Sequence, residues 1–218
     1  MLNESKGNMY PFVTHTFNAI KGKCPHDCIY CYMKVFKQND LRLDEKEFKT
    51  NLGDHNFIFV GSSTDMWAED VDSAWITRVL NYTNYNGTMN KYLFQTKNPA
   101  RFIGGWSFPT ETILACTIET NRDITDISKA PSPEERYHSF KYINMPKMVS
   151  IEPVLDFDTD VMLEWIKTIK PEFVSIGADS KNHGLPEPSP DNLRDFLNKL
   201  SSITEIVQKK NLARLLPK

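Results

Sequence analysis

Short apolar runs alternate with amphipathic stretches along most of this chain. The apolar runs are rich in β-branched and aromatic residues, which predicts strands over residues 12–20, 57–63, 91–96, 112–120, 147–154 and 173–178. The stretches between them repeat apolar residues at helical spacing, which predicts helices over residues 32–52, 71–85, 99–104, 133–143, 158–169 and 190–203. Strands and helices that alternate in this way build right-handed βαβ units around a parallel sheet.

The number of these units sets the expected fold class. Six units fall short of the eight of a complete barrel, so we expect an α/β fold, a partial (β/α)6 barrel with parallel strands, in one domain over residues 1–218. Ser132 and Ser189 each precede a proline, an arrangement typical of a capped helix start. The final segment, residues 205–216, fits a strand or a helix.

Composition narrows the class of protein. The 218 residues include 26 basic and 28 acidic side chains, a net charge of −2, and no long basic tract. This balance argues against strong non-specific binding to duplex nucleic acid. No apolar run approaches the roughly 18 residues needed to span a membrane, and the first residues lack a signal-peptide pattern. We therefore expect a cytoplasmic protein that does not enter a membrane.

Three of the four cysteines lie within eight residues, at Cys24, Cys28 and Cys31. A secreted disulfide protein would spread its cysteines along the chain, so this grouping indicates a metal site in a reducing compartment. Three thiolates can hold three irons of a [4Fe–4S] cluster and leave the fourth iron without a protein ligand. The alternative is a zinc site whose fourth ligand is one of His15, His26 and Cys116, although zinc loops more often show two C-x2-C pairs.

The C-x3-C-x2-C spacing, with aromatic Tyr30 before the third cysteine, resembles the signature of the radical S-adenosylmethionine (radical SAM) superfamily. The resemblance implies a partial (β/α)6 core, a [4Fe–4S] cluster, and S-adenosyl-L-methionine bound at the open iron. It further implies an external electron donor such as flavodoxin or ferredoxin, and cleavage of S-adenosylmethionine to a 5′-deoxyadenosyl radical. Tyr30 would lie beside the adenine, chiefly through its backbone.

Polar residues follow the second and third predicted strands. The superfamily binds the methionine amino group after the second strand, where this chain has Gly61, Ser62, Ser63 and Asp65. The segment departs from the usual Gly-Gly-Glu pattern, and a plain strand-to-loop turn is the alternative. Lys97, at the end of the third strand, is a candidate for binding a carboxylate or phosphate. The alternative is a lysine exposed to solvent.

The fourth and fifth strands add further candidates for cofactor binding. Glu119 and Asn121 occupy alternate positions, so they face the same way and suit the ribose hydroxyls that the superfamily binds here. Glu152 interrupts an apolar strand, and a buried carboxylate is costly without a partner, so it is interpreted as a pocket residue. Trp67, just after the Ser-Ser-Thr-Asp segment, is a candidate for stacking on a substrate ring.

Two short segments resemble a narrower group, the short, largely phage-encoded radical SAM proteins similar to spore photoproduct lyase. They are the Thr-Lys stretch that contains Lys97 and the Glu-Pro stretch that begins at Glu152. This resemblance implies that the substrate is a nucleobase or nucleotide. Cys116, usually interpreted as a small core residue, would then be a candidate hydrogen-atom donor. Asp179 stands where the group has glutamate, which leaves its role open.

Two other functions remain open from the sequence. One is an activating enzyme that places a glycyl radical on a partner protein. The other is a non-catalytic module in which the metal has a structural role.

Overall fold

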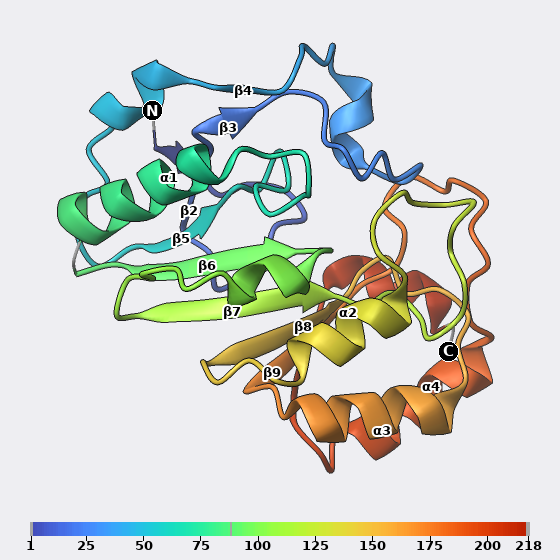
Figure 1. Ribbon diagram of the computed structural model, residues 1–218. Helices are drawn as coiled ribbons and strands as arrows, with labels where there is room; N and C mark the ends of the chain where they lie inside the picture. The colour runs from blue at the N-terminus through green and yellow to red at the C-terminus, as the bar shows by residue number, and fades with distance from the viewer. Residues whose placement is uncertain (1, 88, 217–218) are drawn as a thin grey trace.

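The structure is a computed structural model that describes residues 2–87 and 89–216. At its centre is an eight-stranded sheet in the order β1-β2-β5-β6-β7-β8-β9-β10 (Figure 1). Every neighbouring pair from β2 to β10 is parallel, and only β1 runs antiparallel to its neighbour. The strands are β1 (Asn3–Glu4), β2 (His15–Phe17), β5 (Phe57–Val60), β6 (Lys91–Thr96), β7 (Thr112–Thr117), β8 (Lys147–Ile151), β9 (Phe173–Ile176) and β10 (Glu205–Gln208). The predicted α/β class with a parallel sheet is confirmed.

The helices lie in the crossover connections between strands, along the outer face of the sheet (Figure 1). They are α1 (Ser73–Asn86), α2 (Pro133–Phe140), α3 (Thr159–Ile169), α4 (Pro190–Leu200) and the 3₁₀ helix η3 (Pro99–Ile103). Both predicted caps are confirmed: Ser132 forms a capping box with Glu135, and the Ser189 side chain accepts a hydrogen bond from the Asn192 backbone N–H.

The prediction of one helix over residues 32–52 is wrong. The segment forms two 3₁₀ helices, η1 (Tyr32–Val35) and η2 (Glu45–Lys49), with β4 (Arg42–Leu43) between them. Strand β4 pairs with β3 (Ile20–Lys21), so the predicted strand over residues 12–20 is also divided. The reason is a close approach of the backbone at Gly22, where φ is +112° and a Cβ would lie 2.3 Å from the Asp40 carbonyl oxygen.

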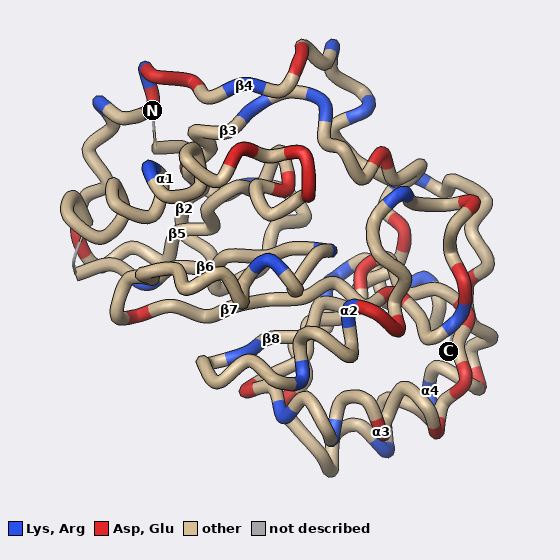
Figure 2. Tube along the Cα trace, in the orientation of Figure 1, with Lys and Arg blue, Asp and Glu red and all other residues tan. Residues whose placement is uncertain are grey.

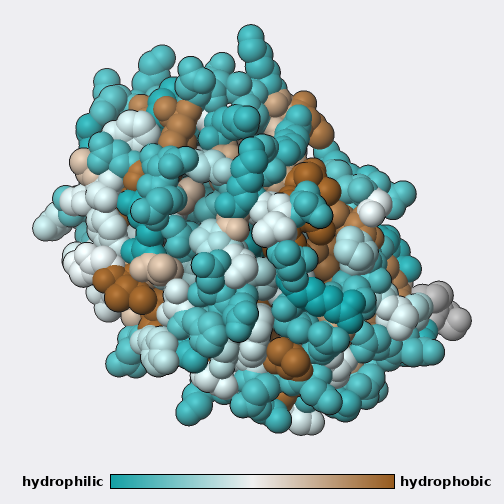
Figure 3. All heavy atoms as spheres, turned by 45° about the vertical axis from the view of Figure 1, so that its right-hand side comes forward, coloured by the Kyte–Doolittle hydropathy of each residue, from teal (hydrophilic) through white to brown (hydrophobic). Residues whose placement is uncertain are grey.

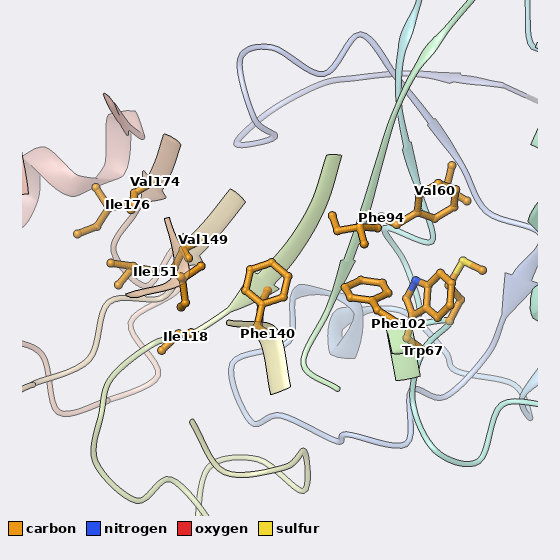
Figure 4. Packing of buried hydrophobic residues seen from close by; sticks show 14 of the residues in the cluster. Val60, Trp67, Phe94, Phe102, Ile118, Phe140, Val149, Ile151, Val174 and Ile176 are labelled. Atoms are coloured by element: carbon orange, nitrogen blue, oxygen red, sulfur yellow. The ribbon is translucent and has the colours of Figure 1, made fainter. Parts of the chain in front are cut away.

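The two faces of the sheet carry different clusters. On the outer face, alternate strand residues such as Val60, Phe94, Val149 and Val174 pack against the helices (Figure 4). On the inner face, a second apolar cluster contains Phe59, Leu93, Ala115 and Met148 together with Tyr10 and Val13 of the N-terminal segment. The N-terminal segment therefore fills part of the inner face of the sheet. Trp67 belongs to the outer cluster and is fully buried, with its ring centroid 4.8 Å from that of Phe102, which contradicts its predicted stacking on a substrate.

The C-terminal segment, left open from the sequence, contains both kinds of element. Residues 205–208 form β10 parallel to β9, and the 3₁₀ helix η4 (Lys210–Leu215) follows. Over residues 2–87 and 89–216 the sheet thus has seven parallel strands where six were expected. Within the described residues, no helix has the length and apolar character required to cross a membrane.

Candidate active site

A cavity of about 460 Å3 lies at the carboxyl ends of the parallel strands. Its walls include Gly61 after β5, Gln95 of β6, Thr117 of β7 and Glu152 after β8. Cys24, Cys28 and Cys31 line the same cavity. In parallel α/β folds the carboxyl ends of the strands are the usual position of active sites. The cavity is therefore the candidate active site.

Two tight turns shape the cysteine loop. The backbone N–H of Asp27 donates to the Cys24 carbonyl at 3.2 Å, and that of Cys31 donates to the Cys28 carbonyl at 3.1 Å. The three thiols are free; Cys28 is buried, while Cys24 and Cys31 are half-buried. Cys28 Sγ lies 3.0 Å from the Ser128 hydroxyl oxygen. These turns bring the three predicted ligands to one wall of the cavity.

The donor set fits an iron–sulfur cluster. Burial raises the pKa of the Cys24 thiol to about 12, and burial also raises the pKa of Cys31. A bound metal favours the thiolate form and would reverse these shifts. Among the described residues, no group of three or more His, Cys, Asp or Glu is arranged to hold a single metal ion. A [4Fe–4S] cluster takes one thiolate per iron, so its cysteines need not meet at one point.

The candidate zinc ligands lie in different surroundings. His26 lines the cavity, but its Nε2 lies 2.9 Å from Asp65 Oδ2. His15 and Cys116 are not among the described residues that line the cavity. The structure therefore does not bring a free fourth zinc ligand from this set to the three cysteines.

Asp65 connects the cysteine loop to the sheet. Its Oδ2 accepts hydrogen bonds from the Thr96 hydroxyl at 2.9 Å and the Lys97 backbone N–H at 2.8 Å, and it also faces His26. Burial opposes ionisation of Asp65, but His26 and the backbone N–H groups of Lys97 and Trp67 lower its pKa overall. Because Asp65 already has these three partners, the structure favours an anchoring role over the predicted contact with the methionine group.

The short polar segment after β5 does face the cavity. Gly61, at φ +79°, Ser62 and Ser63 all line it. Asn18 Oδ1 accepts hydrogen bonds from the Ser62 hydroxyl at 3.2 Å and the Ser63 backbone N–H at 3.0 Å. The hydroxyl of Tyr32, in η1, donates to the Ser62 carbonyl at 2.8 Å. The structure thus brings the three predicted residues together with the cysteines.

Glu119 lies at the centre of a buried polar network. It accepts hydrogen bonds from the Tyr30 hydroxyl and from Arg136 Nη1, the latter at 2.7 Å, and Lys97 Nζ lies 3.5 Å away. Burial opposes its ionisation, but Arg136 and Lys97 outweigh burial and lower the pKa of Glu119 to about 2. Glu119 is fully buried and is not among the described cavity-lining residues, which contradicts its predicted contact with the ribose.

Arg136 is a site residue that the sequence analysis missed. It lies on α2 at a buried position between Pro133 and Phe140, and no part of its side chain is exposed. The signal was present in the sequence, because the spacing of Pro133, Arg136 and Phe140 puts a charged residue within the apolar stripe of the helix. A buried arginine requires an acidic partner, which here is Glu119.

The part of the cavity around Glu152, Lys209, Tyr10 and Gln95 is also polar. We call it the far half, because β8 and β10 lie across the sheet from β2, which precedes the cysteine loop. Glu152 lines it and lies 2.7 Å from Lys209 Nζ. Burial raises the pKa of Glu152, and Lys209 opposes this shift only in part. Tyr10 donates its hydroxyl to Gln95 Oε1 at 2.8 Å, and Lys209 Nζ lies 4.8 Å from the centroid of the Tyr10 ring. Tyr10 and Lys209 were missed because no local pattern marks residues that reach the cavity from the N-terminal segment and from the end of β10.

Two further candidate residues, Asn121 and Cys116, do not reach the cavity, whereas Asp179, whose role was left open, does. Asn121 Nδ2 donates to Asp158 Oδ2 at 3.0 Å, and Asn121 is not one of the described residues that line the cavity. Cys116 is fully buried in the cluster between the sheet and the helices, away from the cavity wall, so its position does not support a role as hydrogen-atom donor. Asp179 lines the cavity, with Oδ1 at 2.8 Å from His183 Nδ1.

No protein-family model matches the chain, and no curated protein matches it. Solved structures do share its fold. Spore photoproduct lyase complexed with dinucleoside spore photoproduct has a TM-score of 0.63 and 10% sequence identity, over 93% of this chain and 64% of that chain. SuiB of Streptococcus suis bound to the precursor peptide SuiA has a TM-score of 0.65 and 8% identity, over 91% of this chain and 49% of that chain. The SuiB structure with S-adenosylmethionine gives a TM-score of 0.65 and 9% identity, over 91% of this chain and 50% of that chain.

Spore photoproduct lyase and SuiB are both radical SAM enzymes. The predicted resemblance to that superfamily is therefore confirmed at the level of the fold. The narrower resemblance to a short phage-type group is not supported by these comparisons. The chain spans between about half and two-thirds of the length of these solved proteins.

Proposed function

We propose that this protein is a radical SAM enzyme and that its whole chain, residues 1–218, is one catalytic domain. In the proposal, Cys24, Cys28 and Cys31 hold a [4Fe–4S] cluster and the cavity binds S-adenosylmethionine. The observation that carries the proposal is the position of these cysteines, which line one cavity together with the polar carboxyl ends of the parallel strands. The chemistry supplied by the bound cofactors is one-electron cleavage of S-adenosylmethionine to methionine and a 5′-deoxyadenosyl radical that takes hydrogen from a substrate.

The residues of the cavity have complementary roles in this proposal. Lys97 lines the cavity beside the cysteines, and it supplies a cation for the carboxylate of S-adenosylmethionine. Gly61, Ser62 and Ser63 supply carbonyl and hydroxyl oxygens for the methionine amino group. Tyr30, held by Glu119, forms a wall for the adenine. Phe59 and Met9 give the cavity an apolar part that limits the access of water to the radical.

We further propose that the substrate is a nucleobase or nucleotide. One support is the fold likeness to spore photoproduct lyase, which was solved with a dinucleoside photoproduct. The second support is the far half of the cavity, where Glu152, Lys209 and Gln95 offer both donors and acceptors, as recognition of a flipped or single base requires. A protein substrate, as for a glycyl-radical-activating enzyme, is the competing outcome of the substrate test.

Anaerobic reconstitution with iron and sulfide, followed by incubation with dithionite and S-adenosylmethionine, tests the catalytic proposal. We expect about four irons and four sulfides per chain and formation of 5′-deoxyadenosine. Cys28→Ala should lose both, whereas Cys116→Ala, which removes another buried cysteine, should keep both. One zinc per chain, or no 5′-deoxyadenosine from a fully loaded protein, would refute the proposal and favour a structural metal-binding module.

Deuterium transfer tests the substrate. Deuterated nucleosides, dinucleotides and short peptides are added separately to the loaded enzyme, and mass spectrometry follows deuterium in 5′-deoxyadenosine. Transfer from a nucleoside or dinucleotide supports the proposal. Transfer only from a peptide would instead support a peptide- or protein-modifying enzyme.

A further inference from the structure

Four exposed apolar side chains belong to the cysteine loop and the helix that follows it. Ile29, Tyr32, Val35 and Phe36 are 43%, 48%, 60% and 59% exposed. Tyr32 and Val35 begin and end η1, and residues three apart share one face of a 3₁₀ helix. The other large exposed apolar side chains of the described residues are spread between positions 85 and 161. We call the four residues the η1 surface. The face of the molecule drawn in Figure 3 is mostly hydrophilic, with a few separate hydrophobic patches.

Lysines surround the η1 surface. The loop from residue 22 to residue 41 contains Lys23, Lys34 and Lys37, against the acidic residues Asp27 and Asp40 (Figure 2). Asp27 is paired with Lys34 at 3.0 Å and with Lys129, from another loop, at 2.9 Å. This region therefore has an excess of basic over acidic residues in a chain whose net charge is −2. Exposed apolar groups with a charged rim are typical of a protein-docking surface.

The cysteine loop is reached from two sides. Cys24 lines the active-site cavity, and it also lines a separate outer cleft of about 340 Å3. That cleft is lined by Lys23, Pro25, Asp27, Leu41, Asp70 and Lys129. The first cysteine of the motif therefore separates the cavity from the outside of the molecule. An electron can reach this loop without passing through the space that the substrate must occupy.

We propose that the η1 surface is the docking site of the protein that supplies the electron, a small one-electron carrier with an acidic rim around its redox centre. This inference rests on the proposed function and adds its partner. In the transfer the carrier is oxidised by one electron, the cluster is reduced by one electron, and no atom moves between them. The lysines attract the acidic rim and speed encounter, while the apolar side chains hold the complex briefly.

The observations favour an electron carrier over a macromolecular substrate. Tyr32 reaches the cavity wall, but the other three residues of the η1 surface, Ile29, Val35 and Phe36, are not among the described residues that line the cavity, where the substrate must react. The η1 surface is also small, and transient electron-transfer complexes have small interfaces. A large substrate would need a surface continuous with the far half of the cavity, near Glu152 and Lys181, which lies with different elements of the fold.

The test compares two reductants on the reconstituted cluster. The variant is Val35→Ser/Phe36→Ser, and the control is Ile103→Ser, which removes an apolar side chain 62% exposed on η3. Stopped-flow bleaching of the cluster, without S-adenosylmethionine, measures reduction by a reduced acidic flavodoxin and, separately, by dithionite. We expect the variant to lose about tenfold in the second-order rate constant with flavodoxin and to match the wild-type protein with dithionite. Binding of oxidised flavodoxin, followed by NMR, should weaken in parallel.

Each alternative result would overturn the inference. Equal rates with flavodoxin would show that the η1 surface does not bind the carrier. Equal losses with both reductants would show that the substitutions damage the cysteine loop. If the cluster is reduced at the wild-type rate but turnover is lost only on an oligonucleotide or protein, the η1 surface is a substrate-binding site. Failure of the proposed function is seen separately, as absence of 5′-deoxyadenosine when the wild-type protein is reduced with dithionite.

Discussion

Arg136 Nη1 donates to Glu119 Oε2 across 2.7 Å, and neither side chain is exposed to solvent. The same carboxylate accepts a hydrogen bond from Tyr30, the residue before the last cysteine of the motif. A fully buried ion pair therefore contacts the loop that carries the proposed metal ligands. This arrangement joins α2 and the end of β7 to the cysteine loop, and it makes the stability of the loop depend on two charges.

Removing one member of this ion pair should lower the free energy of unfolding more than removing both members. Glu119→Gln leaves the Arg136 guanidinium buried without a carboxylate, and we expect the free energy of unfolding to fall by about 3–5 kcal/mol. Glu119→Gln combined with Arg136→Met removes both charges at similar volume, and we expect a smaller loss. Urea denaturation of the metal-free protein measures both. If the stability losses of Glu119→Gln and Arg136→Met, measured singly, add up to the loss in the double variant, the two charges are not coupled.

Acid should weaken the protein through the same carboxylate. The pKa of Glu119 is about 2 in the folded protein, against an ordinary value of 4.5. A lowered folded-state pKa gives stability that is present above about pH 4.5 and is lost as the pH falls toward 2. The difference corresponds to roughly 3 kcal/mol.

Denaturation curves from pH 6 to pH 2 test this pH dependence. The double variant Glu119→Gln/Arg136→Met should lose less stability over that range than the wild-type protein. Glu134→Gln, which removes an exposed carboxylate from the same helix, should follow the wild-type curve. The same steep acid loss in the double variant would assign the effect to other carboxylates.

The parts of the fold with short-range causes were predictable. Apolar runs gave the central strands β5 to β9, and the Ser-Pro pairs gave the starts of α2 and α4. The cysteine motif identified one wall of the cavity, because its signal lies within eight residues. The hairpin of β3 and β4 was missed because it depends on a contact between Gly22 and Asp40, which are 18 positions apart.

Side-chain orientation was the weaker part of the site prediction. Strand alternation places Cys116 and Thr117 on opposite faces, but the sequence alone does not say which face the helices cover. Glu119 was expected to contact the ribose, but it is buried against Arg136, which α2 supplies from a distant part of the chain. Pairing of buried charges over long sequence separations has no local signature.

The hydroxyl of Tyr30 should contribute to retention of the cluster. Tyr30→Phe keeps the ring and removes only the hydrogen bond to Glu119, so the cysteine loop loses one link to the buried pair. Because partners outside the ligand set commonly change metal affinity by about tenfold or more, we expect about tenfold faster loss of iron to a chelator. Tyr32→Phe is the matched control.

The Tyr32→Phe variant also removes a hydroxyl from this loop. The hydroxyl of Tyr32 donates to the backbone carbonyl of Ser62, and Tyr32 is half exposed. Water can replace that bond, so iron loss should change little. Iron content is measured by absorbance and by metal analysis after gel filtration. Equal rates of loss in the two variants would mean that the contact between Tyr30 and Glu119 does not stabilise the loop.

Lys209 should control the charge of Glu152 in the far half of the cavity. Burial raises the pKa of Glu152 and the Lys209 ammonium, 2.7 Å away, opposes that rise, so Lys209→Met should raise the pKa further. A carboxyl whose folded-state pKa is raised contributes stability below its unfolded value, and that contribution is lost as the pH increases. The destabilisation caused by Lys209→Met should therefore grow as the pH rises above 4.5, the ordinary value for a glutamate. Adding Glu152→Gln should remove this pH dependence, and a loss that is constant with pH would mean that Lys209 contributes through packing on Tyr10 instead of through charge.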